Sequence, residues 1–208
     1  MAEVKFFDLD QLQALQNLTL GTNHVTRWQG TPQVLPYNVS THAYNCAMLY
    51  LQLSSVINAT PNLPLLTALL CHDNMESLTG DVLALAKDAV EDSWEQIEEE
   101  IQQRFMQDNA VSELDVVHFL PTETDFDMNL TPNEKRLLKI IDMLEFLLHA
   151  QQEYRAGNCN SKIMQGLRYG GQSLKNRLRA EHGADPVFDA YCVAVHSYYN
   201  RQIAELRL

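Results

Sequence analysis

The sequence predicts an all-α fold. Apolar residues recur at helical spacing through most of the chain, strand-like alternation is nearly absent, and several helix caps can be recognised directly. At 208 residues, the chain is expected to form one domain over 1–208 with a sizeable core. Its motifs fall within about 20–160, and further C-terminal helices are expected over 160–206.

The first half of the chain contains three expected helices. Asp8 is a candidate N-cap for a leucine-rich helix. A loop with two glycines and two prolines follows, and the next helix is expected to begin at Ser40. The third is expected to begin near Pro61 and to continue through "LPLLTALLCHDNMES" until Gly80 stops it.

The second half is also helical in pattern. The stretch "DVLALAKDAVEDSWEQIEEEIQQRFMQ" predicts one helix with a wide, acidic, solvated face, and residues 121–130 are expected to be irregular. Thr131 and Glu134 form a capping box for a helix that is expected to end at Gly157. Two more helices are expected, over residues 160–181 and 186–206, and the pair Asp185-Pro186 marks the start of the second.

The composition and charge of the chain argue against several classes of protein. The net charge of −12 argues against a partner that is a nucleic-acid polymer, because such binding needs a basic surface. The N-terminus lacks the basic and apolar segments of a signal peptide, and the longest apolar run, near "LPLLTALLC", is too short to span a membrane. Four scattered cysteines predict reduced, mostly buried thiols, and we expect a cytoplasmic protein.

The stretch "LLCHDNMESLTGDV" places four ionisable residues directly after a run of leucines. Buried ionisable groups are costly unless they are paired, hydrogen-bonded or bound to a metal. On one continuous helix His72 and Glu76 would share a face, with Asp73 about 100° away. The stretch therefore predicts part of a metal site, which needs further ligands from other helices.

Two residues elsewhere are candidates for those ligands. His42 opens an apolar helix, and Asp142 interrupts the apolar run "LLKIIDMLEFLL". Two imidazoles and two carboxylates suit a divalent first-row metal. Taken singly, His42 could be a capping histidine, and Asp142 could pair with Lys139 or Arg136. The whole set, rather than any one member, favours the metal site.

This H…HD…D set resembles the HD-domain phosphohydrolases, an all-α superfamily. The segments "TRWQGTPQVLPYNVSTHAYNCA", "CHDNMESLTGDVLALAK" and "KIIDMLEFLLHAQQEYRAGN" are similar to those of the bacterial HD-domain 5'-deoxynucleotidases. The related phage dATP triphosphohydrolases are similar in the same places. The resemblance covers about residues 20–160 and implies a compact multi-helix HD-domain fold.

The resemblance also implies roles for particular residues. The implied ligands of one divalent transition metal (Co, Mn, Zn, Ni or Fe, rather than Mg) are His42, His72, Asp73 and Asp142. The acidic residues matched to orientation or activation of the attacking water are Glu76 and Asp81. The residues matched to phosphate and sugar binding are Arg27, Trp28 and Lys87.

The implied activity is hydrolysis of 2'-deoxynucleotides at the 5' phosphate by a homo-oligomer, in the host cytoplasm if the protein is phage-encoded. The alternatives are a dATP or dNTP triphosphohydrolase, a nucleotide sensor without turnover, and a structural helical protein. Three departures stand out: Thr41 precedes His42 where many bacterial members have an acid, Gly30 is small, and the last fifty residues match poorly.

Overall fold

A computed structural model of the chain describes residues 9–82, 84–90, 92–111, 119–122, 125–126, 129–179 and 185–204. Within these residues every named element is helical, which confirms the all-α prediction. The one β-type pairing recorded there is an isolated bridge between Thr26 and Asn38. The candidate N-cap Asp8 lies outside the described residues.

The elements in chain order are α1 (Leu9–Gly21), the 3-10 turn η1 (Thr22–His24), α2 (Val39–Val56), α3 (Leu63–Cys71), α4 (Glu76–Thr79), α5 (Ala84–Val90), α6 (Asp92–Asn109), α9 (Pro132–Arg155), α10 (Ser161–Arg179), α11 (Pro186–Tyr199) and the π-helical turn η2 (Asn200–Ala204).

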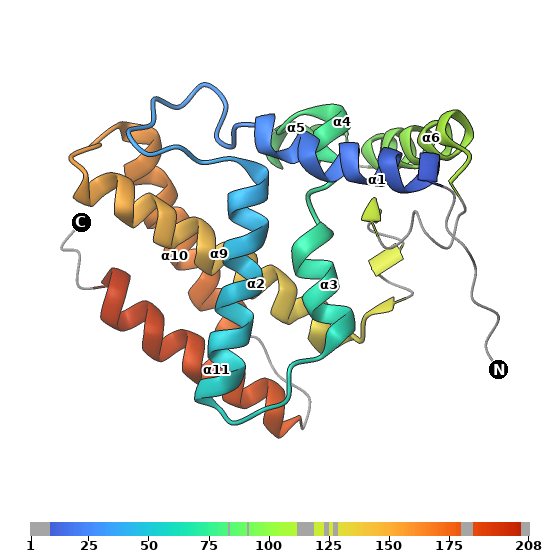
Figure 1. Cartoon of the computed structure of the whole chain (residues 1–208). Coiled ribbons are helices and arrows are strands. Elements are labelled where there is room, and N and C mark those ends of the chain that lie inside the picture. The colour runs from blue at the N-terminus through green and yellow to red at the C-terminus, as the bar shows by residue number, and fades with distance from the viewer. Residues whose placement is uncertain are drawn as a thin grey trace.

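Helix α9 is the centre of the fold, and α2, α3, α10 and α11 pack against it or against one another around it (Figure 1). Its apolar residues Ile141, Leu144 and Leu147 are fully buried in the main core. Because α9 has neighbours on several sides, polar residues on it are buried as well, among them Glu145 and Glu153. Both carboxylates therefore depend on hydrogen-bond donors inside the protein: Glu145 contacts His42, and Glu153 accepts from the backbone of Val34 and Leu35.

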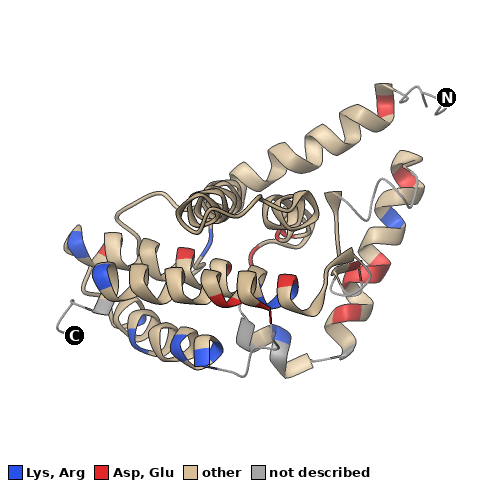
Figure 2. Cartoon of the chain, turned by 90° about the horizontal axis from the view of Figure 1, so that it is seen from below, with Lys and Arg blue, Asp and Glu red and all other residues tan. Residues whose placement is uncertain are grey.

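Helices α1, α4, α5 and α6 lie on one side of this core (Figure 1). They are joined by small apolar clusters, one of which contains Leu18, Met75 and Leu120. Charge is unevenly distributed: most charged residues of α6 are acidic, whereas those of α10 are all basic (Figure 2). The molecule thus has a large core around α9 and a smaller side built from α4, α5 and α6.

The helix expected from Pro61 to Gly80 is interrupted, which corrects the prediction. Helix α3 ends at Cys71, and the following backbone bonds span three residues, as from Glu76 N to Asp73 O at 3.0 Å. Asn74 turns inward and donates to the carbonyl of Phe119 at 2.8 Å, so a tertiary contact accompanies the tighter turn. In such a turn residues three apart share a side, which places Glu76 beside Asp73. His72 and Glu76 also line one cavity, although they do not lie on one continuous helix.

The helix expected after Gly80 corresponds to two described elements, α5 and α6. The structure has α5 and α6 on either side of residue 91, which is outside the described residues. The two helices retain contacts with each other.

The local signals of the second half are confirmed. Thr131 and Glu134 form the complete capping box of α9. Asp185 caps α11 by accepting from the backbone N–H groups of the first turn. All four cysteines are free, and all but Cys159 are buried. Among the described helices none is long and apolar enough to cross a membrane.

Candidate metal centre and substrate cavity

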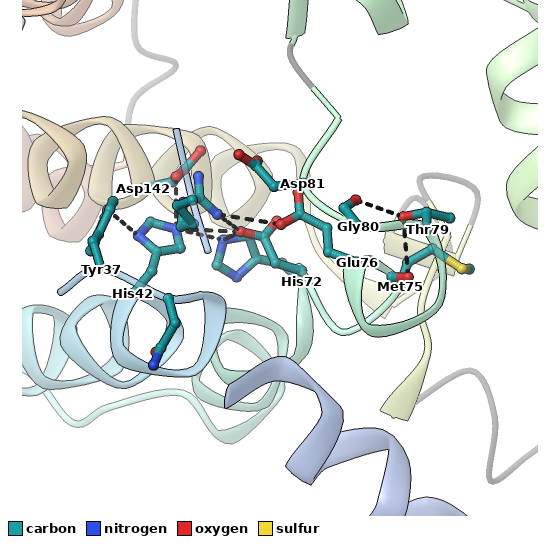
Figure 3. A network of polar contacts seen from close by, with 12 residues as sticks. Tyr37, His42, His72, Met75, Glu76, Thr79, Gly80, Asp81 and Asp142 are labelled. Atoms are coloured by element: carbon teal, nitrogen blue, oxygen red, sulfur yellow. Dashed lines mark hydrogen bonds and ion pairs between the residues drawn. The ribbon is translucent and has the colours of Figure 1, made fainter. Parts of the chain in front are cut away.

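Side chains from three separated segments converge at the inner end of the turn between α3 and α4 (Figure 3). His42 comes from the first turn of α2, where Asn38 caps the helix by accepting from the Thr41 N–H. His72 follows the last residue of α3, and Asp142 comes from the middle of α9. The sequence prediction that distant helices bring these residues together agrees with this placement.

Distances between the candidate ligand atoms match those around a single ion. From His42 Nε2, His72 Nε2 lies at 3.2 Å, Asp142 Oδ1 at 3.1 Å and Asp73 Oδ2 at 3.5 Å. Two ligands about 2.1 Å from one ion are about 3.0 Å apart at a right angle and about 3.4 Å apart at the tetrahedral angle. The distances from His42 Nε2 to the other three donor atoms therefore fit ligands of one divalent cation.

Cys46 also lies in this cluster: one donor atom each of His42, Cys46, His72 and Asp142 falls within 4.8 Å of the others. The sulfur lies 3.8 Å from Nδ1 and 3.7 Å from Nε2 of His42. Because these distances are almost equal, the sulfur lies beside the imidazole ring and not along the direction of the Nε2 lone pair. Burial raises the pKa of Cys46 to about 11, so the thiol stays neutral. Cys46 thus lies next to the cluster as a buried thiol, and Asp73 Oδ2, which lies 3.4 Å from His72 Nε2, is the alternative fourth donor.

The two imidazoles of the candidate site differ in their electrostatic surroundings. Burial lowers the pKa of His72, which favours the neutral imidazole that a metal requires. Burial also opposes a charge on His42, but Cys46, Tyr37 and Asp142 raise its pKa well above the usual value, so a metal ion would displace a proton from His42.

Burial opposes ionisation of both aspartates, but neighbouring cationic groups outweigh it. His72 and Arg27 hold the pKa of Asp73 well below its usual range, and His42 lowers that of Asp142 to about 2. The set is therefore two carboxylates and two imidazoles.

Glu76 and Arg27 lie next to the cluster, and of the two only Glu76 lines the cavity that opens beside it. Arg27 forms a hydrogen-bonded ion pair with Asp73, and its Nη1 lies 3.9 Å from Glu76 Oε2. Glu76 Oε2 and Arg27 Nε are both buried without a hydrogen-bond partner among the described residues. Burial and the Asp73 carboxylate raise the pKa of Glu76 well above its usual range. One acceptor and one donor are thus left for a bound molecule.

A cavity of about 380 Å³ opens onto these groups, a volume in the range of small-molecule sites. Its wall includes residues of the candidate centre together with others from α5, α6 and the 119–126 segment: His72, Asp73, Met75, Glu76, Lys87, Trp94, Glu95, Glu98, Pro121, Phe126, Lys139 and Asp142. Lys87 Nζ lies 4.0 Å from Glu76 Oε1, 3.9 Å from Glu98 Oε1 and 5.3 Å from the centre of the Trp94 ring. The cavity thus combines cations with an aromatic wall.

The loop before α2 carries the other predicted substrate residue. Trp28 has a φ of 58°, in the left-handed region, and its carbonyl accepts from the Thr31 N–H at 2.9 Å. Its half-buried ring packs edge-on against Phe146, with the ring centres 4.8 Å apart. Asp81 accepts a long hydrogen bond, 3.4 Å, from the backbone N–H of Gln29. Asp81 therefore touches the loop that presents Arg27 and Trp28, whereas Glu76 lines the cavity.

Comparison with known proteins identifies the family. The chain matches the YfbR-like family, described as 5'-deoxynucleotidase YfbR-like, over residues 14–176. The chain belongs to this family. It is a hydrolase of the HD phosphohydrolase type, a metal-dependent phosphohydrolase of deoxynucleotides. The match is longer than the 20–160 covered by the motifs and includes most of α10, where the sequence resemblance was expected to end.

Two solved structures share the fold of this YfbR-like chain. One is the cyanophage S-2L HD phosphohydrolase DatZ, bound to dA and one catalytic Zn²⁺ ion. It is 15% identical with a TM-score of 0.64, and the match covers 90% of this chain and 95% of DatZ. The other is a conserved hypothetical protein from Pyrococcus furiosus, 20% identical with a TM-score of 0.53, covering 81% of this chain and 99% of that one. Comparison with curated proteins gave no match.

Sequence reasoning missed two polar residues that support the site. Glu145 contacts His42 through its carboxylate, and Tyr37 donates to the same carboxylate. A signal for Glu145 was present, because it also interrupts the apolar run of α9, three residues after Asp142. Tyr37 lies in an irregular loop, where no periodicity indicates which way a side chain points.

Proposed function

We propose that this enzyme removes the 5' phosphate of 2'-deoxynucleoside monophosphates and releases a deoxynucleoside and orthophosphate. The observation that carries the proposal is the convergence of four metal-type ligands beside a cavity that also contains a buried acid and two cations. The proposal refines the activity of the family by naming the substrate and the residues.

In this proposal His42, His72, Asp73 and Asp142 hold one divalent transition metal. The donor set suits Zn, Co, Mn, Ni or Fe better than Mg, which prefers oxygen ligands and retained waters. When bound, such an ion stabilises the negative charge of the phosphoryl oxygens and lowers the pKa of a coordinated water. The solved structure of DatZ is described with one catalytic Zn²⁺, which makes zinc a reasonable first choice for experiments.

Glu76 is proposed to accept a proton from the attacking water. Its Oε2 is buried, faces the cavity and has no hydrogen-bond partner among the described residues, as an acceptor awaiting a donor would. Its raised pKa makes it a stronger base than an exposed glutamate, provided that it is ionised when substrate binds. A sensor without turnover has no need of such a base.

Arg27 and Lys87 are proposed to bind the phosphate. The guanidinium of Arg27 is held by Asp73, and its buried Nε is available to a phosphate oxygen. Lys87 approaches the same region from α5 as a compact point charge. We assign Trp28 to the sugar, where the ring held by Phe146 would exclude a ribose 2'-hydroxyl. Asp81 then acts by holding the backbone of this loop at Gln29.

A second candidate function is a deoxynucleoside triphosphohydrolase that releases tripolyphosphate. Four cations could bind the additional phosphates: Lys135, Arg136, Lys139 and Arg168. Of these, Lys139 lines the cavity, one helical turn before Asp142. A third cation beside Arg27 and Lys87 exceeds what a single phosphate needs, and this favours the second candidate.

Product analysis separates the two functions. Purified enzyme is incubated with dAMP, dATP, AMP and ATP in the presence of Mn²⁺, Co²⁺ or Zn²⁺, and the released anion is identified by ion chromatography. We expect orthophosphate from dAMP and slower turnover of AMP. Tripolyphosphate from dATP, with dAMP left intact, would establish the second candidate. If none of the nucleotides is consumed, both candidates are wrong.

A further inference from the structure

A buried polar network lies directly behind His42, on the side away from the cavity. Glu145 on α9 is 3% exposed, and its Oε2 lies 2.6 Å from Nδ1 of His42. The same Oε2 accepts from the hydroxyl of Tyr37, and Oε1 accepts from the side-chain amide of Asn45 at 2.9 Å. The carboxylate therefore has three donors arranged around it, although it lies inside the protein.

The direction of these hydrogen bonds determines where the proton of His42 lies. Donors lie at both oxygens of Glu145, the side-chain amide of Asn45 at Oε1 and the hydroxyl of Tyr37 at Oε2, as expected for a carboxylate that accepts at each oxygen. An ionised carboxylate can only accept, so His42 must donate through Nδ1. This leaves the lone pair on Nε2, the atom that lies 3.2 Å from His72 Nε2 and 3.1 Å from Asp142 Oδ1.

The same network connects the centre to the loop that presents Arg27 and Trp28. Tyr37 belongs to this loop; its hydroxyl reaches Glu145, and its ring stacks on His149 with the centres 3.7 Å apart. The backbone carbonyl of Tyr37 accepts from the Arg27 N–H at 3.0 Å. Glu145 thus contacts a candidate ligand on one side and the anchor of the loop on the other.

We infer that Glu145 is a positioning residue, which fixes the ring orientation and the tautomer of His42 so that Nε2 faces the metal. The inference rests on the proposed function, because it requires that His42 bind a metal. A carboxylate behind a ligating histidine also makes the imidazole a better donor, and the loss of such a partner typically lowers metal affinity about 10–100-fold. No step of the hydrolysis passes through Glu145 itself.

The test compares two substitutions of Glu145 with a matched control. Glu145→Gln keeps the size and an acceptor oxygen but removes the charge, and Glu145→Leu removes the acceptor. The control is Glu153→Gln, because Glu153 is equally buried on α9 but accepts from the backbone N–H groups of Val34 and Leu35. Zn²⁺ affinity is measured for each full-length protein by competition with a chelator, and thermal unfolding is followed alongside.

We expect the Zn²⁺ affinity to fall about 10-fold for Glu145→Gln and up to about 100-fold for Glu145→Leu, with Glu153→Gln close to wild type. In the Zn²⁺-loaded wild type, ¹⁵N NMR should show a protonated His42 Nδ1 whose proton exchanges slowly, and this exchange should accelerate in Glu145→Gln. If Glu145→Leu fails to fold, the comparison of Glu145→Gln with wild type and with Glu153→Gln decides the test.

Wild-type affinity and unchanged Nδ1 exchange in Glu145→Gln would overturn the inference. An equal loss of affinity in Glu153→Gln would also overturn it, because the effect would then belong to any buried carboxylate of α9. If the wild-type protein itself binds no Zn²⁺, Mn²⁺ or Co²⁺, the proposed function fails instead, and the two failures are therefore distinguishable.

Discussion

The two walls of the cavity differ in how they are built. The wall that carries the candidate ligands comes from α2, α3 and α9, and residues such as His42 and Ile141 are completely buried there. The opposite wall comes from α5, α6 and residues of the 119–126 range. Apolar residues of α6 and Leu120 belong to small separate clusters, whereas Phe126 packs against the main core. We infer from this difference that the core holds the metal ligands in place, whereas the outer helices contact the substrate.

The largest effect is expected from a change in the core wall. His72→Ala removes one of two imidazole ligands, and we expect the protein to lose bound metal and its activity to fall to the uncatalysed background. Metal content after purification, measured by mass spectrometry, and turnover of the preferred nucleotide check this. Retention of stoichiometric metal and activity by the variant would mean that the ion, if present, is bound elsewhere.

Glu76→Gln should separate metal binding from turnover. The substitution keeps the volume but removes the proposed base, so kcat should fall at least about 10²-fold while metal content and nucleotide affinity stay near wild type. Steady-state kinetics with a parallel nucleotide titration give both quantities. An unchanged kcat would reject the role of Glu76 as a base.

A substitution in the outer wall of the cavity should weaken nucleotide binding and leave metal binding unchanged. Lys87→Met removes a cation from α5, and we expect KM for the nucleotide to rise about 10-fold, with metal content unchanged.

Lys139→Met tests whether the cavity accepts a triphosphate. If it does, the substitution should raise KM for dATP more than KM for dAMP. Equal effects of Lys139→Met on both nucleotides would remove the main support for the second candidate function.

The smallest effect concerns stability in acid. Hydrogen bonds from Val34, Leu35 and Asn158 lower the pKa of Glu153, although burial opposes its ionisation. Because the folded-state pKa is depressed, the stabilisation is present above the unfolded-state pKa of about 4.3 and is lost as the pH falls through the folded-state value. Glu153→Gln should therefore be about 1–3 kcal/mol less stable at pH 7 and lose less stability between pH 5 and pH 3. Urea unfolding across this range measures both; parallel curves would contradict the assignment.

Sequence patterns predicted the parts of the fold that depend on interactions between residues close together in the sequence. The capping box at Thr131 and the cap at Asp185 follow from local hydrogen bonds, and both are present. The break after Cys71 could not be predicted, because it accompanies a hydrogen bond from Asn74 to the distant Phe119. For the same reason His72 and Glu76 do not lie on one continuous helix, although both line the cavity.

The candidate site was partly predictable from chemistry. His42 and Asp142 were identified because each places a polar group in an apolar helix, and the structure brings both to one point. Glu145 gave the same signal, but sequence alone could not show whether it would be a ligand or lie behind one. Which of the two acids on α9 faces the ion depends on the packing of α2 against α9, a tertiary property.

The most direct test of the central claim is a crystal structure of the protein loaded with Zn²⁺ or Mn²⁺, with anomalous data collected at the absorption edge of the metal. We predict one strong anomalous peak about 2.0–2.3 Å from donor atoms of His42, His72, Asp73 and Asp142. A structure in which the two imidazoles face different sides of the molecule, or in which the peak lies elsewhere, would contradict the account.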